Sequence, residues 1–180
     1  METSKEMIEQ IAAFEGCKLT AYKDIAGIWT IGVGHTGPEV KSGMTITKEQ
    51  AMDLLRKDLA SAEKYVNALN KVLEAKHSGM MQKHFDALVS LVYNCGSGAI
   101  RSGSTMRNVL IERGVYATPY INKAFMLWCK YTDPVTGKKL VSKGLQKRRA
   151  IEAGWYGFGA GWALAMSEKK ITDIVQWATT

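Results

Sequence analysis

The stretch FEGCKLTAYKDIAGIWTIGVG, residues 14–34, holds two carboxylates and four glycines. Its hydrophobic pattern changes from the helical period to alternation, which predicts two short strands around a turn at residues 24–27. Alternation in the second strand puts Thr30, Gly32 and Gly34 on one face. A strand face with so few side chains weakens a sheet unless something must approach it closely. We therefore expect this bare face to form the floor of a site for a bulky ligand.

Helix signals stand on both sides of this stretch. Thr3 and Glu6 form a T-x-x-E capping box, which predicts a first helix over residues 3–15 that ends before Gly16. Thr47 and Gln50 form a second box, which starts a long helix. A buried stripe recurs along that helix every three or four residues: Ala51, Leu55, Leu59, Ala62, Val66, Leu69 and Leu73.

The rest of the chain has helical patterns only. Phe85, Leu88, Val89 and Val92 form a core face, a capped helix runs from Ser104 to Arg113, and further helices run from Thr118 to about Tyr131 and to about Trp155. We predict an α+β chain that is mostly helical and forms a single domain over residues 1–180. Its small β-containing N-terminal lobe (16–47) is joined by a linking helix (48–76) to a helical lobe (77–180), on which the first helix packs.

Composition restricts the class of protein. The 180 residues are enough for a real core, and no apolar run has the roughly 18 residues of a membrane span. The N-terminus predicts no signal peptide, so we expect synthesis in the cytoplasm. Cys17, Cys95 and Cys129 have no zinc-type spacing and read as reduced, mostly buried thiols. No metal site or cofactor is expected, and His35 is interpreted as a structural residue.

The net charge of +7 favours an anionic partner surface. Between Asp133 and Glu152 there is no acidic residue, while six basic residues occur there: Lys138, Lys139, Lys143, Lys147, Arg148 and Arg149. A solvated basic face and a patch for an anionic cell envelope both fit. Without aromatic interleaving or a helix-turn-helix signature, we expect no nucleic-acid partner.

The two carboxylates of the opening stretch differ in their expected surroundings. Glu15 ends its helix, where the helix dipole and apolar neighbours favour the protonated carboxyl. Asp24, in a polar turn, is expected to stay ionised. Two carboxyls held in different protonation states are suited to general acid and base roles. Spacing alone, however, also fits two ordinary surface acids.

Glu15, eight residues, Asp24, five residues and Thr30 resemble the catalytic pattern of the phage-type lysozymes, glycoside hydrolase family 24. FDALVSLVYNCGSGAIRSGSTMRNVL and GLQKRRAIEAGWY resemble later segments of that family, in the same order. The resemblance implies a lysozyme-like fold and an endolysin that hydrolyses the β-1,4 bond between N-acetylmuramic acid and N-acetylglucosamine in peptidoglycan. Glu15 would protonate the leaving oxygen, and Asp24 with Thr30 would activate water in an inverting mechanism.

Further expectations also come from the resemblance. Gly34, Thr36, Tyr93 and Ser104 match substrate-binding positions. The protein would be a monomer without a cofactor, would depend on a holin to reach the peptidoglycan of the periplasm, and would lyse the host of a phage or prophage.

Other functions stay open alongside this one. A lytic transglycosylase uses one glutamic acid and makes an anhydro-sugar, and a cationic protein could bind peptidoglycan or the envelope without cleaving it. Residues 157–180 extend beyond the shared region. Their apolar positions fit either one more core helix or an amphipathic segment that docks on the envelope: Trp162, Ile171, Ile174, Val175 and Trp177.

Overall fold

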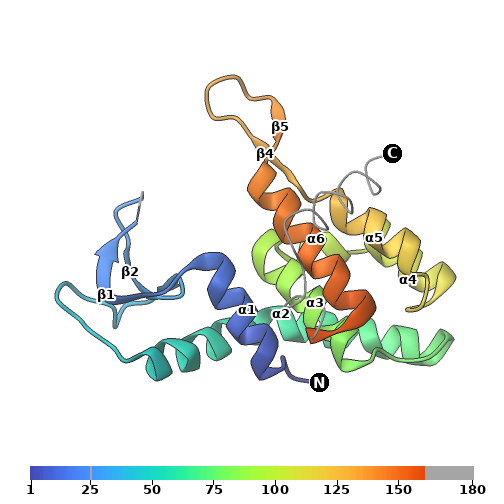
Figure 1. Cartoon of the computed structure of the whole chain (residues 1–180), viewed down its shortest axis with the longest axis horizontal. Coiled ribbons are helices and arrows are strands. Elements are labelled where there is room, and N and C mark those ends of the chain that lie inside the picture. The colour runs from blue at the N-terminus through green and yellow to red at the C-terminus, as the bar shows by residue number, and fades with distance from the viewer. Residues whose placement is uncertain (25, 161–180) are drawn as a thin grey trace. The chain divides into compact units, whose positions relative to one another are not determined.

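The computed structural model describes residues 1–24 and 26–160. The chain folds as two compact units (Figure 1). Among the described residues, 2–61 form one unit, and residue 1 with residues 62–160 forms the other. The first unit holds a helix and the small sheet, and the second is mostly helical, so the predicted α+β class is confirmed. The organisation as a single domain stays a prediction.

The first helix, α1 (Lys5–Glu15), has its N-cap one residue after the predicted cap, Thr3. Ser4 is the N-cap, and its hydroxyl accepts a hydrogen bond from the Met7 N–H at 3.2 Å. The box of Thr3 and Glu6 is therefore not the cap, because the adjacent serine takes the extended backbone that starts the helix. The end is as predicted: Gly16, at φ +77°, donates its N–H to the Ala12 carbonyl at 2.9 Å.

Three antiparallel strands follow, in the order β1-β2-β3. They are β1 (Lys18–Lys23), β2 (Trp29–Gly32) and β3 (His35–Thr36). The strands on either side of the turn at residues 24–27 are confirmed, but the third was not predicted. The chain turns at Val33 and Gly34 instead of continuing as one strand, because two glycines with positive φ allow a reversal there.

The glycine face of β2 is covered at Gly32. A Cβ added there would lie 3.4 Å from the Cβ of Ala51 and 3.5 Å from Cδ1 of Ile46. The expected ligand floor is therefore wrong at Gly32, because the chain's own side chains fill the space. Nothing lies within 4 Å of a Cβ added at Gly34, which is exposed.

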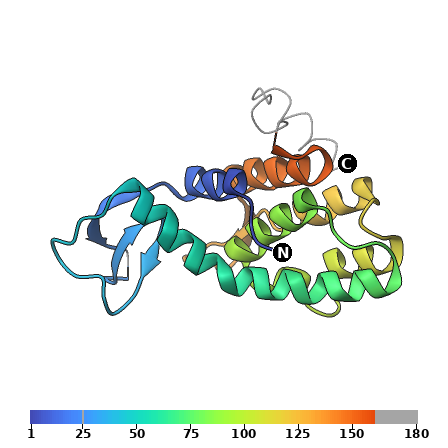
Figure 2. The same cartoon turned by 90° about the horizontal axis from the view of Figure 1, so that it is seen from below.

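The long helix is α2 (Lys48–Lys76), which Figure 2 shows as one continuous element. Its capping box is confirmed: the Thr47 N–H donates to Gln50 Oε1 at 2.8 Å, and the Gln50 N–H donates to Thr47 Oγ1 at 3.1 Å. The predicted apolar stripe is also confirmed, since all seven of its side chains are buried.

The remaining elements belong to the second unit. They are α3 (Gln82–Cys95), η1 (Ser97–Ile100), α4 (Thr105–Arg113), α5 (Thr118–Met126), β4 (Lys130–Thr132), β5 (Lys139–Val141) and α6 (Lys143–Phe158). Helix α6 packs against α3 and α5. The predicted core face of α3 is buried, and Ser104 caps α4 by accepting a hydrogen bond from the Arg107 N–H at 3.2 Å.

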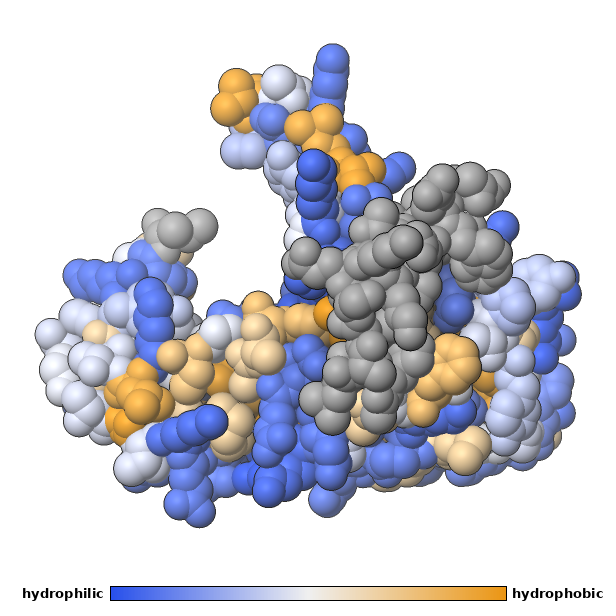
Figure 3. Space-filling view, in the orientation of Figure 1, coloured by the Kyte–Doolittle hydropathy of each residue, from blue (hydrophilic) through white to orange (hydrophobic). Residues whose placement is uncertain are grey.

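The hairpin β4–β5 replaces the predicted end of α5, which stops at Met126 and not near Tyr131. Tyr131 pairs with Leu140, and one oxygen of Asp133 accepts the N–H groups of Val135 and Thr136 in the turn. An Asp-Pro turn between two alternating segments favours a hairpin over a helix. Figure 3 shows the hairpin standing out from the helices of this unit.

The two arginines of the basic stretch are buried, which corrects the expectation of a basic face at that point. Arg149 is fully buried, as is Glu152, and their Nε and Oε2 lie 3.0 Å apart. Arg148 donates from Nε to Glu152 Oε1 at 3.1 Å, and Ser90 of α3 donates to the same oxygen at 2.7 Å. A carboxylate three or four residues from the arginines compensates their charge and so allows burial.

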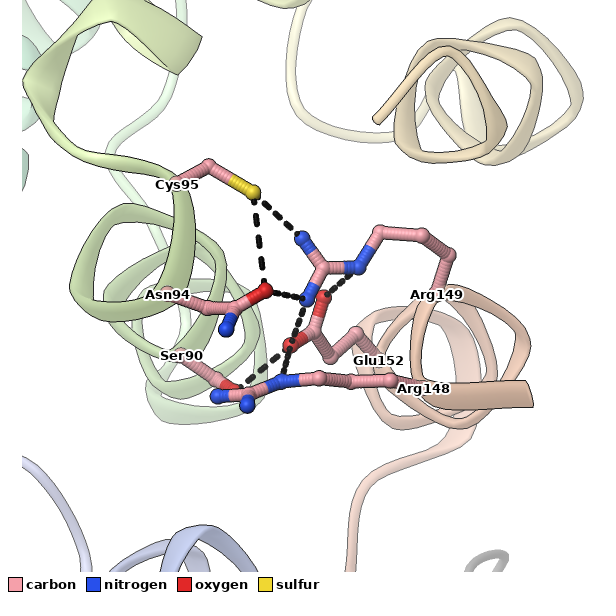
Figure 4. Close-up of polar contacts among 6 residues, drawn as sticks. All are labelled: Ser90, Asn94, Cys95, Arg148, Arg149 and Glu152. Atoms are coloured by element: carbon pink, nitrogen blue, oxygen red, sulfur yellow. Dashed lines mark hydrogen bonds and ion pairs between the residues drawn. The ribbon is translucent and has the colours of Figure 1, made fainter. Parts of the chain in front are cut away.

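Figure 4 shows the Arg149 guanidinium also facing the end of α3. It donates to Asn94 Oδ1 at 2.9 Å and to the Cys95 sulfur at 2.8 Å. All three cysteines are free thiols, as expected, but Cys17 is exposed and not buried. Burial raises the pKa of the Cys95 thiol, although the charge of Arg149 opposes this.

No helix within residues 1–24 and 26–160 is long and apolar enough to cross a membrane. The two alternatives for the tail, a further core helix or an amphipathic segment that docks on the envelope, depend on residues 162–177, which lie outside the described residues.

Candidate active site

Asp24 and Thr30 are fixed to one another through the backbone of Ile28. The Asp24 N–H and the Thr30 hydroxyl both donate to the Ile28 carbonyl, at 3.0 and 3.1 Å. Asp24 Oδ1 in turn accepts the N–H groups of Ala26 and Ile28, at 2.8 and 2.9 Å. This tight turn between β1 and β2 therefore holds a carboxylate and a hydroxyl in a defined relation.

The arrangement leaves specific hydrogen-bonding capacity unused. Among the described residues, hydrogen bonds to the Asp24 carboxylate reach only Oδ1, so Oδ2 is available to accept another. The Thr30 hydroxyl uses its one hydrogen on Ile28, so its lone pairs remain acceptors. Two acceptors that are both tied to the Ile28 peptide group could each accept one hydrogen of a water molecule.

Glu15 is the last residue of α1, in the same compact unit as Asp24 and Thr30. Its position at the negative end of the helix is as predicted. Its expected burial among apolar neighbours is wrong, because the residue is exposed. The reason is local: Met7, Ile8 and Ile11 form the buried face of α1, and Glu15 follows after the last of these.

Gly34 and Thr36 follow β2 in sequence, and Thr36 belongs to the same sheet. Thr36 is exposed on β3 and pairs directly with Thr30 of β2, and Gly34 is exposed in the turn between those strands. The structure thus brings Thr36 next to one proposed catalytic residue. Tyr93 on α3 and Ser104, the cap of α4, are both half-buried and belong to the second unit.

His35 has the structural surroundings that were expected of it. Its Nδ1 lies 2.9 Å from Asp58 Oδ1 on α2, and its Nε2 lies 2.8 Å from Glu39 Oε1. Burial opposes a charge on the ring, but the hydrogen bonds with Glu39 and Asp58 prevail and raise the pKa of His35. The ring therefore ties β3 to α2 within the first unit.

No cluster of metal-ligating side chains occurs in the part of the chain that the structure describes.

The family model described as phage lysozyme matches residues 12–152, which include Glu15, Asp24, Thr30 and the later blocks. The chain belongs to the phage lysozyme family.

Comparison with individual proteins supports the same family. It is 37% identical to the endolysin of Salmonella phage P22 over 134 residues, which cover 72% of this chain and 85% of that protein. Among solved structures, an endolysin from Escherichia coli O157:H7 phage FAHEc1 has 39% identity and a TM-score of 0.69, covering 87% of this chain and 93% of that one. The muramidase domain of SpmX from Asticaccaulis excentricus has 32% identity and a TM-score of 0.71, with 86% and 97% covered.

Sequence reasoning missed one part of this candidate site, the peptide group of Ile28. A backbone carbonyl that accepts hydrogen bonds from two residues leaves no pattern in the sequence of side chains. The turn signal around Gly27 was the nearest indication, since a tight turn brings residues 24 and 28 together.

Proposed function

We propose that this peptidoglycan-degrading lysozyme cleaves the bond between N-acetylmuramic acid and N-acetylglucosamine with Glu15 as general acid and with water held by Asp24 and Thr30. Membership of the phage lysozyme family supports the reaction class. The observation that carries the assignment of roles is a pair of acceptors fixed through Ile28, Asp24 Oδ2 and Thr30 Oγ1, to which none of the described residues donates.

A water that donates one hydrogen to each acceptor turns a lone pair outward, toward a bound sugar. Asp24 then takes a proton as that oxygen attacks the anomeric carbon, and Thr30 keeps the water oriented. Attack by water from the face opposite the leaving group inverts the anomeric configuration. That mechanism requires carboxyls roughly 6.5–9.5 Å apart when substrate is bound.

Glu15 supplies the other proton. Its carboxyl lies at the exposed end of α1, where a bound glycan can reach it. As the general acid, Glu15 donates its proton to the glycosidic oxygen as the bond breaks.

The test compares Glu15→Gln and Asp24→Asn with Glu9→Gln, which removes an exposed carboxylate from the same helix. Loss of proton transfer is expected to lower the rate on purified peptidoglycan by about 10²–10⁴-fold in the first two variants. The melting temperatures should stay near that of the parent, and Glu9→Gln should keep parental activity.

Product analysis checks the mechanism. NMR of early products should show the inverted α-anomer at a new muramic acid reducing end. Parental rates in Glu15→Gln would overturn the role of Glu15. Anhydro-muramic acid ends, with activity retained in Asp24→Asn, would establish a transglycosylase instead.

Three finer properties are proposed from the likeness to phage endolysins alone: a monomeric state, synthesis in the host cytoplasm with action in the periplasm, and dependence on a holin.

A further inference from the structure

The hairpin β4–β5 has no cover on either face. Every residue of its two strands is exposed. A two-stranded hairpin is at best marginally stable in water by itself. Its apolar side chains therefore contribute little to the core of the second unit, and their presence on so exposed an element indicates contact with something outside this unit.

Apolar side chains lie at the tip of the hairpin and along its second strand. Val135, in the turn, is 90% exposed, which makes it the most exposed large apolar side chain among the described residues. Leu140 and Val141 of β5 are exposed as well, and Figure 3 shows apolar surface on the projecting hairpin. Polar residues and glycine dominate turns. An exposed valine at the tip, with two further apolar side chains behind it, thus marks a candidate contact surface.

This surface is separate from the cavity of about 610 Å³ beside Trp128. Val135, Leu140 and Val141 do not line that cavity. The hairpin residues that do line it belong to the two strands: Lys130, Tyr131, Thr132 and Lys139.

Lysines flank the apolar side chains. Residues 130–143 contain one carboxylate, Asp133, and four lysines: Lys130, Lys138, Lys139 and Lys143. One oxygen of Asp133 accepts two N–H groups of the turn, so this carboxylate is tied to the backbone. Within residues 1–24 and 26–160, none of the four lysines forms an ion pair. The hairpin therefore carries a net positive charge next to its apolar tip.

This combination fits the surface of a bilayer that contains anionic lipids. Headgroup phosphates attract lysines close to the surface, and the boundary with the acyl chains accepts apolar side chains. A soluble polyanion would use the lysines but leave Val135 in water. An uncharged apolar groove would bury Val135 but leave the lysines without partners.

We propose that the tip of the β4–β5 hairpin docks on bilayers that contain anionic phospholipids, with Val135 at the acyl-chain boundary and Lys138 and Lys139 on the headgroup phosphates. Docking of this kind holds the enzyme at a membrane surface. It goes beyond the proposed function, because it does not depend on which bond the enzyme cleaves.

Binding is measured by sedimentation of the full chain with phosphatidylcholine vesicles that contain or lack phosphatidylglycerol. The parent should sediment with the anionic vesicles and much less with the neutral ones. Val135→Ser should weaken binding to anionic vesicles by about threefold or more, through loss of apolar burial. Lys138→Gln should weaken it by about fivefold, through loss of one headgroup contact.

Two matched controls lie on α2. Tyr65→Ser removes an exposed apolar side chain, and Lys64→Gln removes an exposed lysine and changes the net charge as Lys138→Gln does. Both should bind anionic vesicles as the parent does.

Val135→Trp tests directly whether the tip enters the bilayer. The fluorescence that it adds to that of the parent should move to shorter wavelength on binding and should be quenched by brominated acyl chains. Added fluorescence that neither shifts nor is quenched would overturn the proposal.

The proposal is also overturned if the parent does not bind anionic vesicles, if it binds neutral vesicles equally, or if Val135→Ser binds as the parent does. Full competition by soluble polyglycerol phosphate, with no effect of Val135→Ser, would identify a phosphate polymer as the partner instead.

Turnover of lipid-free peptidoglycan separates this surface from the substrate site. Val135→Ser should keep the parental rate and melting temperature, because its side chain is exposed. A lower rate in that variant would assign the valine to substrate binding and overturn the proposal. Absence of turnover in the parent would refute the proposed function and leave the vesicle result to decide the docking site.

Discussion

At the scale of single residues, one peptide group arranges the proposed water site. The Ile28 N–H bonds Asp24 Oδ1, and the Ile28 carbonyl accepts from Asp24 and Thr30. The side chain of Ile28 is 52% exposed, so its packing contributes little to this geometry. The precision of the site therefore comes from the turn and not from a particular apolar side chain.

Gly34 allows a prediction that separates backbone strain from contact with substrate. Its φ is +78°, and space around it is open. Gly34→Val should lower the free energy of unfolding by about 1–2 kcal/mol, because a side chain strains this conformation. Asparagine adopts positive φ more readily, so Gly34→Asn should cost about 1 kcal/mol or less.

If Gly34 lines the saccharide site, the asparagine still occupies the space intended for a sugar. Peptidoglycan hydrolysis by Gly34→Asn should then fall at least several-fold at a temperature where the variant is fully folded. Parental activity in that variant would show that the glycine is needed only for the turn.

At the scale of elements, a group of rings joins α3 to α6. His84 of α3 is 2% exposed, stacks on Tyr156 of α6 with ring centroids 4.5 Å apart, and meets Tyr116 edge-on at 5.6 Å. The Tyr156 hydroxyl donates to the Val115 carbonyl at 2.8 Å. Burial, and secondarily the charge of Lys83, lower the pKa of His84 to about 4.

This histidine should make the fold sensitive to acid. Below about pH 6.5 the unfolded chain protonates His84 while the folded chain resists until about pH 4. The neutral ring therefore makes its full contribution to the free energy of unfolding above pH 6.5. That contribution falls by up to about 3 kcal/mol as the pH drops from 6.5 to about 4.

His84→Gln removes the titration and keeps an acceptor for the Met81 N–H, which now bonds His84 Nδ1 at 3.3 Å. The variant should be less stable at neutral pH by about 1 kcal/mol, through loss of the ring stack. Urea unfolding from pH 7.5 to pH 4 should show the two stability curves meeting and then crossing as the pH falls, with the variant the more stable protein near pH 4. Parallel curves would contradict the assignment.

At the scale of the whole molecule, the net charge of +7 is carried by exposed side chains more than by the arginines of α6. Arg148 and Arg149 are neutralised in part by Glu152. Lys138 and Lys143, by contrast, are exposed at the hairpin and at the start of α6. Binding to an anionic wall should therefore involve the lysines and not the arginines of this stretch.

Association with intact walls should weaken several-fold as salt rises from about 0.05 to about 0.5 M, because exposed charges are screened. Lys138→Glu with Lys143→Glu should reduce binding at low salt and flatten its salt dependence. The control, Lys64→Glu with Lys71→Glu on exposed positions of α2, changes the net charge equally. Equal losses in both double variants would indicate that total charge, and no particular surface, governs adsorption.

The sequence by itself determined the features that depend on neighbours a few residues apart. The box of Thr47 and Gln50, the apolar stripe of α2, the end of α1 at Gly16 and the turn after Asp24 all follow from such local patterns. The family resemblance came from the spacing of Glu15, Asp24 and Thr30 together with two later blocks in the same order, which are likewise read directly from the chain.

Only the tertiary structure decided what meets across long separations. Ala51 fills the space beside Gly32, and Ser90 completes the burial of Glu152 with its arginines. The cavity beside Trp128 combines two segments that no periodicity relates. Burial and cavities arise from contacts between distant segments, whereas hydrophobic period and capping report only on the local backbone.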